Sequence, residues 1–292
     1  MSAAQGQPDK RKESTYVLDA ESESEMARLL RQDRLLTEGM GGILSEQTDI
    51  SSVQRALDIA CGPGDWVLDV AFTYQDMEVV GIDISERMIT YANAQAQAQG
   101  RSNASFRVMD ALKPLAFPSA SFDLVNARFI SPFVRREMWP AFFAECLRIL
   151  RPGGILRLTE LEWGISNKAS FEKACQMFQH AMTLIGNNFS PNGLHHGIIQ
   201  MLPRFFQQAG LQHISQKGHV LDFSASTAPI IRDGYYHDLS SAFPAIEPVM
   251  AKTHLLSVDA WRELYQKGLA EMYEEDFCSM YILLTVWGQK AS

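Results

Sequence analysis

The sequence predicts an α/β protein built on a mostly parallel β-sheet. Three observations indicate this fold class. Short apolar runs alternate with segments of helical periodicity from about residue 55 onward, the first run leads into a glycine-containing turn, and the alternation continues to about residue 160. Short buried strands alternating with helices are typical of right-handed βαβ units. Of the 292 residues, 46% are hydrophobic and 21% are charged, which is the balance of a globular chain.

Charge and cysteine content exclude several classes of protein. The formal net charge of −8 argues against a protein whose main ligand is the phosphate backbone of DNA or RNA. No stretch reaches the ~18 apolar residues of a membrane helix, and residues 1–14 are polar with no visible signal peptide. The four cysteines lie far apart, so we expect neither a metal site nor disulfides, and a cytoplasmic location.

The N-terminal part is expected to contain one amphipathic helix ahead of the main domain. Residues 1–14 are interpreted as a flexible tail, and a helix is expected over about residues 19–38 of a segment spanning 15–45. Ser22 and Glu25 have capping-box spacing, and glycines at 39, 41 and 42 follow the helix. Such a linker would allow the helix to close over a site as a lid, or to exchange between protomers of a homodimer or higher oligomer.

The main domain is expected over residues 46–160, with its elements in regular alternation. The apolar runs predict strands at residues 56–60, 78–83, 106–109, 122–126 and 154–160. Helical spacing predicts helices at residues 65–74, 85–99 and 136–150. These elements form successive βαβ units.

The remaining residues, 161–292, lose the regular alternation. Helices are expected over residues 171–186 and 198–209, strands near 211–214, 220–223 and 278–287, and two or three helices within 226–275. We interpret residues of about 161–195 and 225–275 as two insertions around a common core. Both are rich in aromatic residues, which suggests substrate-pocket material rather than a separate domain.

The strongest signal is the turn that follows the first predicted strand, Asp58-Ile59-Ala60-Cys61-Gly62-Pro63-Gly64. Glycines allow a ligand to approach the backbone closely, at the end of a strand where open α/β sheets bind ligands. Asp83 closes the second predicted strand about 20 residues later, which is the spacing of an acid that binds ribose hydroxyls. An ordinary tight turn with an acidic strand end is the alternative.

Two phosphate-binding patterns are absent from this turn. A dinucleotide fingerprint beginning at Gly62 would place its third glycine at position 67, where Val67 stands. No Gly-Lys-Ser/Thr sequence follows, which excludes a Walker phosphate loop. The turn therefore favours a nucleoside ligand without a pyrophosphate.

The chain resembles the class I S-adenosylmethionine-dependent methyltransferases of the small-molecule type, over about residues 50–160. The segment 58–64 resembles the family's first motif, with Ala60 where a glycine is usual. Asp83 matches the ribose-binding acid and Asp110 the acid near the adenine amino group. Residues 122–128 match the fourth strand, and 150–154 match the turn before the fifth.

This resemblance implies a Rossmann-like fold with a seven-stranded, mostly parallel sheet, helical insertions after strands 5 and 6, and an N-terminal lid helix. It implies S-adenosyl-L-methionine as cofactor and S-adenosyl-L-homocysteine as product. The residues expected to bind the cofactor are Asp58, Ala60, Gly62, Gly64, Asp83, Ile84, Met88, Asp110, Ala111, Asn126 and Ala127.

Four side chains are candidates for catalysis. Glu160 and Glu162 share one face of the fifth strand, because alternate residues of a strand point the same way. Capping of helices or pairing with Arg128 or Arg157 is the structural alternative for both. His195 and His196 lie in the first insertion, where a structural pair of histidines is the alternative. Two adjacent histidines without a third ligand do not predict a metal site.

The candidates for contact with the methyl acceptor come from several segments. They are Tyr16, Arg128, Trp163, Phe171 and His180. Arg128 is suited to holding a carboxylate or phosphate of the substrate, and a salt bridge within the protein is the alternative. Because the insertions are aromatic-rich, the expected acceptor is hydrophobic, an aromatic or isoprenoid-like natural product of secondary metabolism. The methylated atom could be oxygen, nitrogen or carbon, and catalysis would rest mainly on proximity and orientation.

Three alternatives remain at this stage. An RNA or protein methyltransferase is disfavoured by the acidic charge and by Asn126-Ala127-Arg128-Phe129, where an Asn-Pro-Pro-Tyr-like motif would stand. A protein that binds S-adenosylmethionine without catalysis is a candidate from another class. A nicotinamide oxidoreductase is disfavoured by Val67. No nucleic-acid or membrane partner is expected.

Overall fold

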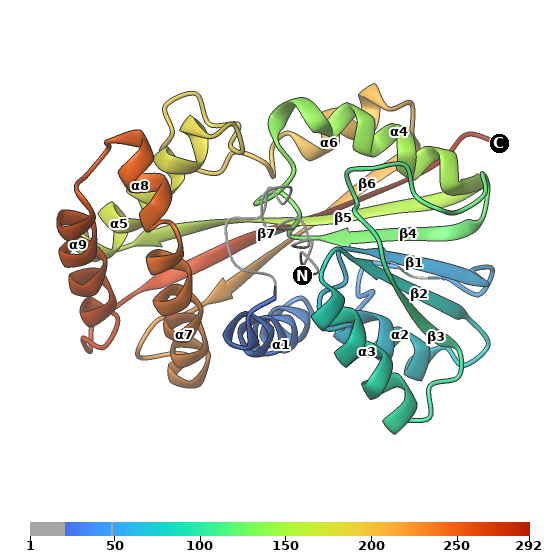
Figure 1. Cartoon of the computed structure of the whole chain (residues 1–292), viewed down its shortest axis with the longest axis horizontal. Coiled ribbons are helices and arrows are strands. Elements are labelled where there is room, and N and C mark those ends of the chain that lie inside the picture. The colour runs from blue at the N-terminus through green and yellow to red at the C-terminus, as the bar shows by residue number, and fades with distance from the viewer. Residues whose placement is uncertain (1–20, 48) are drawn as a thin grey trace, which may run out of the picture.

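The computed structural model describes residues 21–47 and 49–292, and within them it shows one seven-stranded sheet with helices on both faces (Figure 1). The strand order is β3-β2-β1-β4-β5-β7-β6, and β7 runs antiparallel to both of its neighbours. The predicted seven-stranded, mostly parallel sheet is confirmed. The strands are β1 Arg55–Ile59, β2 Glu78–Asp83, β3 Ala104–Val108, β4 Phe122–Arg128, β5 Leu150–Ser166, β6 Gln212–Asp222 and β7 Ser279–Gln289.

Helices cover the two faces of the sheet in separate groups. In Figure 1, α1, α2 and α3 lie below the sheet, and α4 and α6 lie above it. No helix in the described part of the chain is long and apolar enough to cross a membrane. The bounds are α1 Glu23–Gly39, α2 Asp65–Thr73, α3 Glu86–Ala98, α4 Trp139–Ile149 after a short 3-10 turn at Arg136–Met138, α5 Ala169–Leu184, α6 Leu202–Gln208, α7 Pro229–Ala245, α8 Glu247–Thr253 and α9 Val258–Glu271.

The central strands are buried on both faces, which explains their continuous apolar runs. In β1 and β4 the residues Leu57, Leu124 and Val125 have no exposed surface, and in β2 the same holds for Val80. A parallel strand covered by helices on both sides must be apolar throughout, whereas a half-exposed strand would alternate. The buried strands place their carboxyl ends together at one edge of the sheet.

The strands β5 and β6 are longer than the sequence predicts. β5 begins at Leu150 and continues to Ser166, and β6 is one strand where two short ones are expected. The polar residues in the middle of β6 are held in extended conformation by hydrogen bonding to β7, with Gln216 opposite Val286 and Gly218 opposite Leu284. This pairing joins distant segments and leaves no local signal in the sequence.

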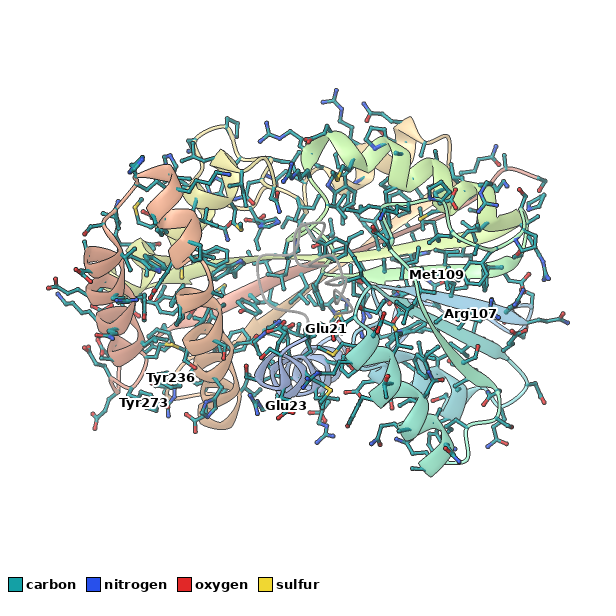
Figure 2. The ribbon with its side chains drawn as sticks, viewed as in Figure 1. Glu21, Glu23, Arg107, Met109, Tyr236 and Tyr273 are labelled. Atoms are coloured by element: carbon teal, nitrogen blue, oxygen red, sulfur yellow. The ribbon has the colours of Figure 1, made fainter. Side chains whose placement is uncertain are left out.

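The two insertions pack around the far ends of β5 and β7. Helix α5 follows β5, and α7, α8 and α9 connect β6 to β7; this confirms helical insertions after strands 5 and 6. They share one hydrophobic cluster, in which Phe171, Tyr235 and Trp261 are almost completely buried. Figure 2 shows Tyr236 of α7 beside Tyr273, which follows α9, with ring centroids 4.9 Å apart.

Helix α1 begins at Glu23, and the expected capping box is wrong. Ser22 is the N-cap residue, but its side chain makes no capping hydrogen bond, and its hydroxyl lies 2.6 Å from that of Ser24. The Glu25 carboxylate instead accepts from Arg28, because a buried guanidinium on the next turn binds it more strongly than the backbone could. The expected tail of residues 1–14, the helix start at residue 19 and Tyr16 lie outside the described residues.

Candidate functional site

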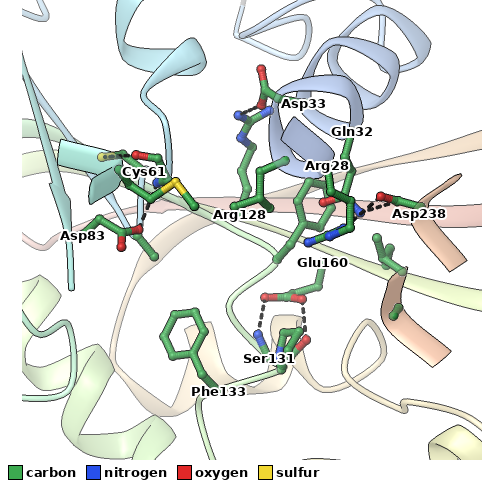
Figure 3. A pocket seen from close by; sticks show the side chains of 18 of the residues that line it. Arg28, Gln32, Asp33, Cys61, Asp83, Arg128, Ser131, Phe133, Glu160 and Asp238 are labelled. Atoms are coloured by element: carbon green, nitrogen blue, oxygen red, sulfur yellow. Dashed lines mark hydrogen bonds and ion pairs between the residues drawn. The ribbon is translucent and has the colours of Figure 1, made fainter. Parts of the chain in front are cut away.

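A cavity of about 290 Å³ opens at the carboxyl ends of the parallel strands β1 to β5, and α1 lines one side of it. Figure 3 shows its two sides: Cys61 and Asp83 come from the turn region, while Arg28 and Asp238 come from α1 and α7. The cavity therefore joins the ends of the central strands to the insertion helices. Its position is that of ligand sites in open α/β sheets.

The turn after β1 presents backbone to the cavity. Ala60 and Gly62 both line it and have positive φ angles of 58° and 53°. Asp83, at the end of β2, accepts a hydrogen bond from the Gly62 amide through Oδ2 and from the Ser85 amide through Oδ1, both at 2.9 Å. The carboxylate also lines the cavity, so it is held in a fixed orientation where it can accept hydrogen bonds from a ligand.

Most of the residues expected to bind the cofactor reach this side of the cavity. Asp58, Ile84, Met88, Asp110 and Ala111 line it together with Ala60, Gly62 and Asp83. Further lining residues were not predicted, and they come from the same strand ends: Cys61, Pro63, Met109 and Leu112. Position directly after a parallel strand is the signal that could have found them.

Gly64 is not among the lining residues. Its φ angle is 92°, and a Cβ there would lie 2.6 Å from Cε1 of Phe106 and 2.9 Å from Cβ of Ala92. Its glycine is therefore required for packing of the turn against β3 and α3. Gly64 does not line the cavity, so the structure does not place it among the residues expected to contact the cofactor.

Asn126 and Ala127 also lie away from the cavity, inside the sheet. Asn126 Nδ2 donates to Asp58 Oδ1 at 2.7 Å, and Asn126 Oδ1 accepts from Arg157 Nη1 at 2.7 Å. Arg157 is itself ion-paired to Glu46, with both side chains 1% exposed. Asn126 thus orients the Asp58 carboxylate from inside the sheet, on the side away from the cavity. Burial raises the pKa of Asp58 to about 7, against the opposing effect of the Arg128 guanidinium.

The other half of the cavity is walled by apolar side chains from β5, α5 and α7. Trp163 and Phe178 form an edge-to-face pair with centroids 5.1 Å apart. The apolar residues lining this half include Leu161, Trp163, Phe178, Met182, Leu239 and Ile246. Two expected acceptor contacts are not found here: Phe171 is fully buried in the neighbouring core, and His180 lies on α5 outside the lining.

Charged side chains line the boundary between the two halves, and each cation is paired. Arg28 Nη1 donates to Asp238 Oδ1 at 2.9 Å, and Arg28 also binds Glu25. Arg128 is ion-paired with Asp33 and donates to Thr37 Oγ1 at 3.0 Å. The structure thus shows the salt-bridge alternative for Arg128. Both arginines among the described lining residues have their charge compensated within the protein.

Glu160 lines the cavity but is fully engaged in hydrogen bonds. Its Oε1 accepts from the amides of Ile130 and Ser131 at 2.8 and 3.1 Å, and its Oε2 accepts from Ser131 Oγ at 2.6 Å. Burial raises the pKa of Glu160 to about 7 despite these hydrogen bonds. The carboxyl fixes the turn after β4, which carries Phe133 into the cavity wall (Figure 3).

Glu162, two residues along β5, is not among the lining residues. Its carboxylate accepts from the amides of His196 at 3.0 Å and Gly197 at 2.5 Å. Burial raises the pKa of Glu162 to about 7, and the hydrogen bonds oppose that shift. Glu162 therefore holds the segment that contains the paired histidines.

The two adjacent histidines are separated by the fold. His195 is exposed and lies outside the lining, whereas His196 is 5% exposed and lines the cavity. His196 Nδ1 lies 3.3 Å from Gln179 Oε1, and Nε2 has no hydrogen-bond partner in the described part of the chain. Burial lowers the pKa of His196 to about 4, so the ring is neutral at neutral pH. Of the pair, only His196 lines the cavity, and its Nε2 is itself buried.

Known sequences match the segment that contains the turn after β1 and the central strands. A family described as "Methyltransferase domain" matches residues 56–154. Demethylmenaquinone methyltransferase of Deinococcus radiodurans is 34% identical over 142 residues, covering 48% of this chain and 56% of that protein. The 27-O-demethylrifamycin SV methyltransferase of Amycolatopsis mediterranei is 35% identical over 137 residues, covering 47% of each. The matches thus span about half the length of these two relatives.

A solved structure extends the likeness over most of the fold. The Haemonchus contortus phosphoethanolamine N-methyltransferase 2, in complex with phosphomonomethylethanolamine and S-adenosylhomocysteine, has a TM-score of 0.53 at 17% identity. The alignment covers 87% of this chain and 52% of that one. The arrangement of sheet and helices is therefore shared well beyond the matched segment.

Proposed function

We propose that this chain, whose residues 56–154 form a class I S-adenosylmethionine-dependent methyltransferase domain, transfers a methyl group to a neutral, hydrophobic small molecule. One observation carries the proposal: a single cavity joins the turn after β1 to an apolar chamber between α1, β5, α5 and α7. Methyl transfer requires two ligands to meet in one water-poor space, and holding them together supplies much of the rate acceleration.

The residues of the turn side fit S-adenosylmethionine. The Asp83 carboxylate is suited to the two ribose hydroxyls, and Asp110 at the end of β3 to the adenine amino group. At Ala60 and Gly62 the small side chains leave the backbone open to close approach by the cofactor. Met88 and Ile84 supply apolar contacts. When bound, the cofactor supplies a methyl group activated by its attachment to a positively charged sulfur.

The charges of the chamber favour an uncharged acceptor. A phosphate or carboxylate would need a cation, but Arg28 and Arg128 are already paired with Asp238 and Asp33. Displacing either carboxylate would leave a buried charge without a partner, at a cost of about 3–5 kcal/mol. We therefore disfavour a phosphorylated amine of the kind bound by the Haemonchus contortus enzyme. The quinone and rifamycin acceptors named for the two relatives are compatible with apolar walls.

Helix α1 is proposed to act as the lid of this site. It contributes Arg28, Leu29, Gln32 and Asp33 to the cavity, so it covers both the turn side and the acceptor side. Closure of such a helix over bound ligands would exclude water from the reacting atoms.

Calorimetric titration of the purified chain with S-adenosylmethionine, S-adenosylhomocysteine and NAD tests the cofactor assignment. Micromolar binding of the first two and none of NAD is expected. Asp83→Asn should weaken binding by about tenfold to a hundredfold, because a charge-assisted hydrogen bond is worth about 1.5–3 kcal/mol. Asp76→Asn, at an exposed position before β2, is the matched control. Binding of NAD, or unchanged affinity in Asp83→Asn, would overturn the assignment.

Mass spectrometry of reactions with hydrophobic aromatic and isoprenoid acceptors then tests turnover. A product heavier by one methylene unit, together with formation of S-adenosylhomocysteine, is the expected result. Methylation of tRNA or histone substrates in its place would favour the macromolecular alternative. Tight cofactor binding without any turnover over a broad panel would favour a binding protein.

A further inference from the structure

We propose that S-adenosylmethionine binds the form of the site in which Asp58 has lost its proton, and that Asn126 and Arg157 are positioning residues that direct this proton to the cavity side of the carboxyl. The proposal rests on the function proposed above and adds regulation by pH to its cofactor site. Asp58 lines the cavity, whereas the two positioning residues are buried inside the sheet and do not line it.

Arg157 fixes the orientation of the Asn126 amide. A guanidinium group has only donors, and Arg157 Nη1 lies 2.7 Å from Asn126 Oδ1, so the oxygen of the amide must face Arg157. The nitrogen of the amide therefore faces Asp58 and donates to its Oδ1 at 2.7 Å. With the amide turned over, donor would face donor at Arg157, so this orientation is the one that the hydrogen bonds allow.

The Asn126 donor determines where Asp58 can carry a proton. Its Oδ1 already accepts a hydrogen atom, so a proton on the carboxyl must lie on Oδ2. No described residue donates to Oδ2, and this oxygen is not among the unpartnered atoms that are closed off from solvent. Because Asp58 lines the cavity, Oδ2 is the oxygen left for a ligand. A ligand that places a positive charge or an N–H donor beside Oδ2 must displace the proton.

Glu46, from the segment that follows α1, balances the buried charge of Arg157. The two side chains form an ion pair at 2.5 Å and are each 1% exposed. Nε and Nη2 of Arg157 donate to Glu46, while Nη1 donates to Asn126. The guanidinium group is thus fixed in orientation, and Glu46 offsets much of the effect that its charge would have on Asp58.

Several charged or titratable groups surround Asp58. They are Arg128 of β4, Arg157 of β5, Asp33 of α1, Asp83 of β2 and the Cys61 thiol. Burial raises the pKa of Asp58 to about 7, while the two guanidinium groups and the Asn126 hydrogen bond oppose the shift. Arg128 is paired with Asp33, so their effects on Asp58 largely cancel. The carboxyl therefore gains or loses its charge near neutral pH.

Most other carboxylates of the cavity are already engaged. Asp33 and Asp238 pair with arginines, and Asp83, Asp110 and Glu160 accept from backbone amides. S-adenosylmethionine has a positively charged sulfur and an ammonium group, and a cation in a water-poor site needs a compensating charge. Asp65, at the start of α2, is the rival of Asp58, because it also lines the cavity and burial raises its pKa to about 6.

The affinity for S-adenosylmethionine should therefore rise with pH. Between pH 6 and pH 8 it should rise by about tenfold and then level off, because the protonated fraction of Asp58 falls from about 0.9 to about 0.1. Calorimetric titration at pH 7 in two buffers of different ionisation enthalpy should show release of about half a proton for each cofactor bound.

Asp58→Asn should abolish this proton release and flatten the pH profile, whereas Asp65→Asn should keep both. A wild-type chain that binds S-adenosylmethionine without releasing a proton, or proton release that persists in Asp58→Asn, would refute the proposal. Absence of binding at every pH would instead refute the proposed function, and the two failures are therefore distinguishable.

Two nearly isosteric changes inside the sheet test the positioning role, because they should move the midpoint of the pH profile in opposite directions. Asn126→Asp keeps an acceptor for Arg157 but replaces the donor to Asp58 by a second carboxylate, so the midpoint should rise by about one pH unit or more. Glu46→Gln removes the negative charge that offsets Arg157, so the midpoint should fall.

Thr159→Val is the matched control for these two variants. It removes another buried polar contact of β5, between hydroxyl oxygens of Thr159 and Thr285 that lie 2.9 Å apart, and it should leave the midpoint unchanged. A merely structural role for Asn126 and Glu46 would weaken binding at every pH without moving the midpoint. That result, or shifts of both midpoints in the same direction, would contradict the proposal.

Discussion

At the scale of single residues, Gly64 and Gly100 share a left-handed backbone but have different surroundings. Their φ angles are 92° and 65°, and in the described structure a Cβ at Gly100 would meet nothing within 4 Å. Gly64→Ala adds a clash with Phe106 to the same backbone strain. We expect it to lower the free energy of unfolding by about 1–3 kcal/mol more than Gly100→Ala. Urea denaturation of both variants measures the difference, and equal losses would contradict the packing role of Gly64.

Glu160 should make stability depend on pH. Its pKa in the folded state is raised from 4.5 to about 7, so the folded chain keeps a proton that the unfolded chain has lost. The contribution of this group to the free energy of unfolding therefore falls as pH rises from about 4.5 to 7, and is constant above. Glutamine does not titrate.

Relative to wild type, Glu160→Gln should gain about 3 kcal/mol between about pH 4.5 and pH 8, at 1.36 kcal/mol for each pKa unit. Parallel urea denaturation series at several pH values measure this difference. A difference that stays constant with pH, or that moves in favour of wild type as pH rises, is incompatible with a raised pKa at Glu160.

Residues that directly follow parallel strands could be placed from the sequence, whereas residues in the longer loops could not be told apart. Asp83 and Asp110 follow parallel strands, where topology alone brings side chains to one edge of the sheet. The separation of His195 from His196 depends on hydrogen bonds to Glu162, Gln179 and Asn188, which come from distant segments without periodic spacing. The sequence predicts that Phe171 lines the pocket because it is aromatic. Aromatic character alone does not distinguish a residue of the cavity wall from a residue of the hydrophobic core, where Phe171 lies.

At the scale of elements, the ion pairs between α1 and α7 should control how firmly α1 is held. Asp238 accepts from both Arg28 and Gln32, at 2.9 and 2.7 Å. Asp238→Asn keeps the size of the side chain but removes its charge. We expect faster amide hydrogen exchange in residues 23–39 and a loss of about 1–3 kcal/mol of stability.

The matched control for this prediction is Asp233→Asn, on the same helix, where the carboxylate is half exposed and bound to its neighbour Arg232. Exchange in α1 should remain at the wild-type rate in this variant. Equal exchange in both variants would show that α1 is held by its apolar contacts alone.

Helices and strands could be predicted where the contacts that stabilise them come from segments nearby in the sequence. The amphipathic and buried patterns of α2, α3, β1 and β2 match the structure closely because each packs against its sequence neighbours. The extension of β5 and the continuity of β6 arise from pairing with β7, whose paired residues lie 58 to 77 positions away along the chain from those of β6. A single sequence contains no direct record of such pairing.

At the scale of the whole molecule, ligand binding should stabilise both halves together. The cavity is lined by the core strands and by the insertion helices, which share one sheet. S-adenosylhomocysteine at a hundred times its Kd should add about 2.7 kcal/mol to the free energy of unfolding. Differential scanning calorimetry should show one transition that moves to higher temperature. Two transitions, of which the ligand moves only one, would show that the halves unfold separately.

The position of β7 has a consequence for the chain during synthesis. This last strand lies between β5 and β6, so β6 has no other partner in the described sheet, and Tyr281 of β7 lines the cavity. The strands β1 to β5 can assemble while the chain is still attached to the ribosome, but the acceptor side cannot close until residues 279–289 have emerged. A nascent or prematurely terminated chain would thus contain the nucleoside-binding half without the enclosure that protects the reaction from water.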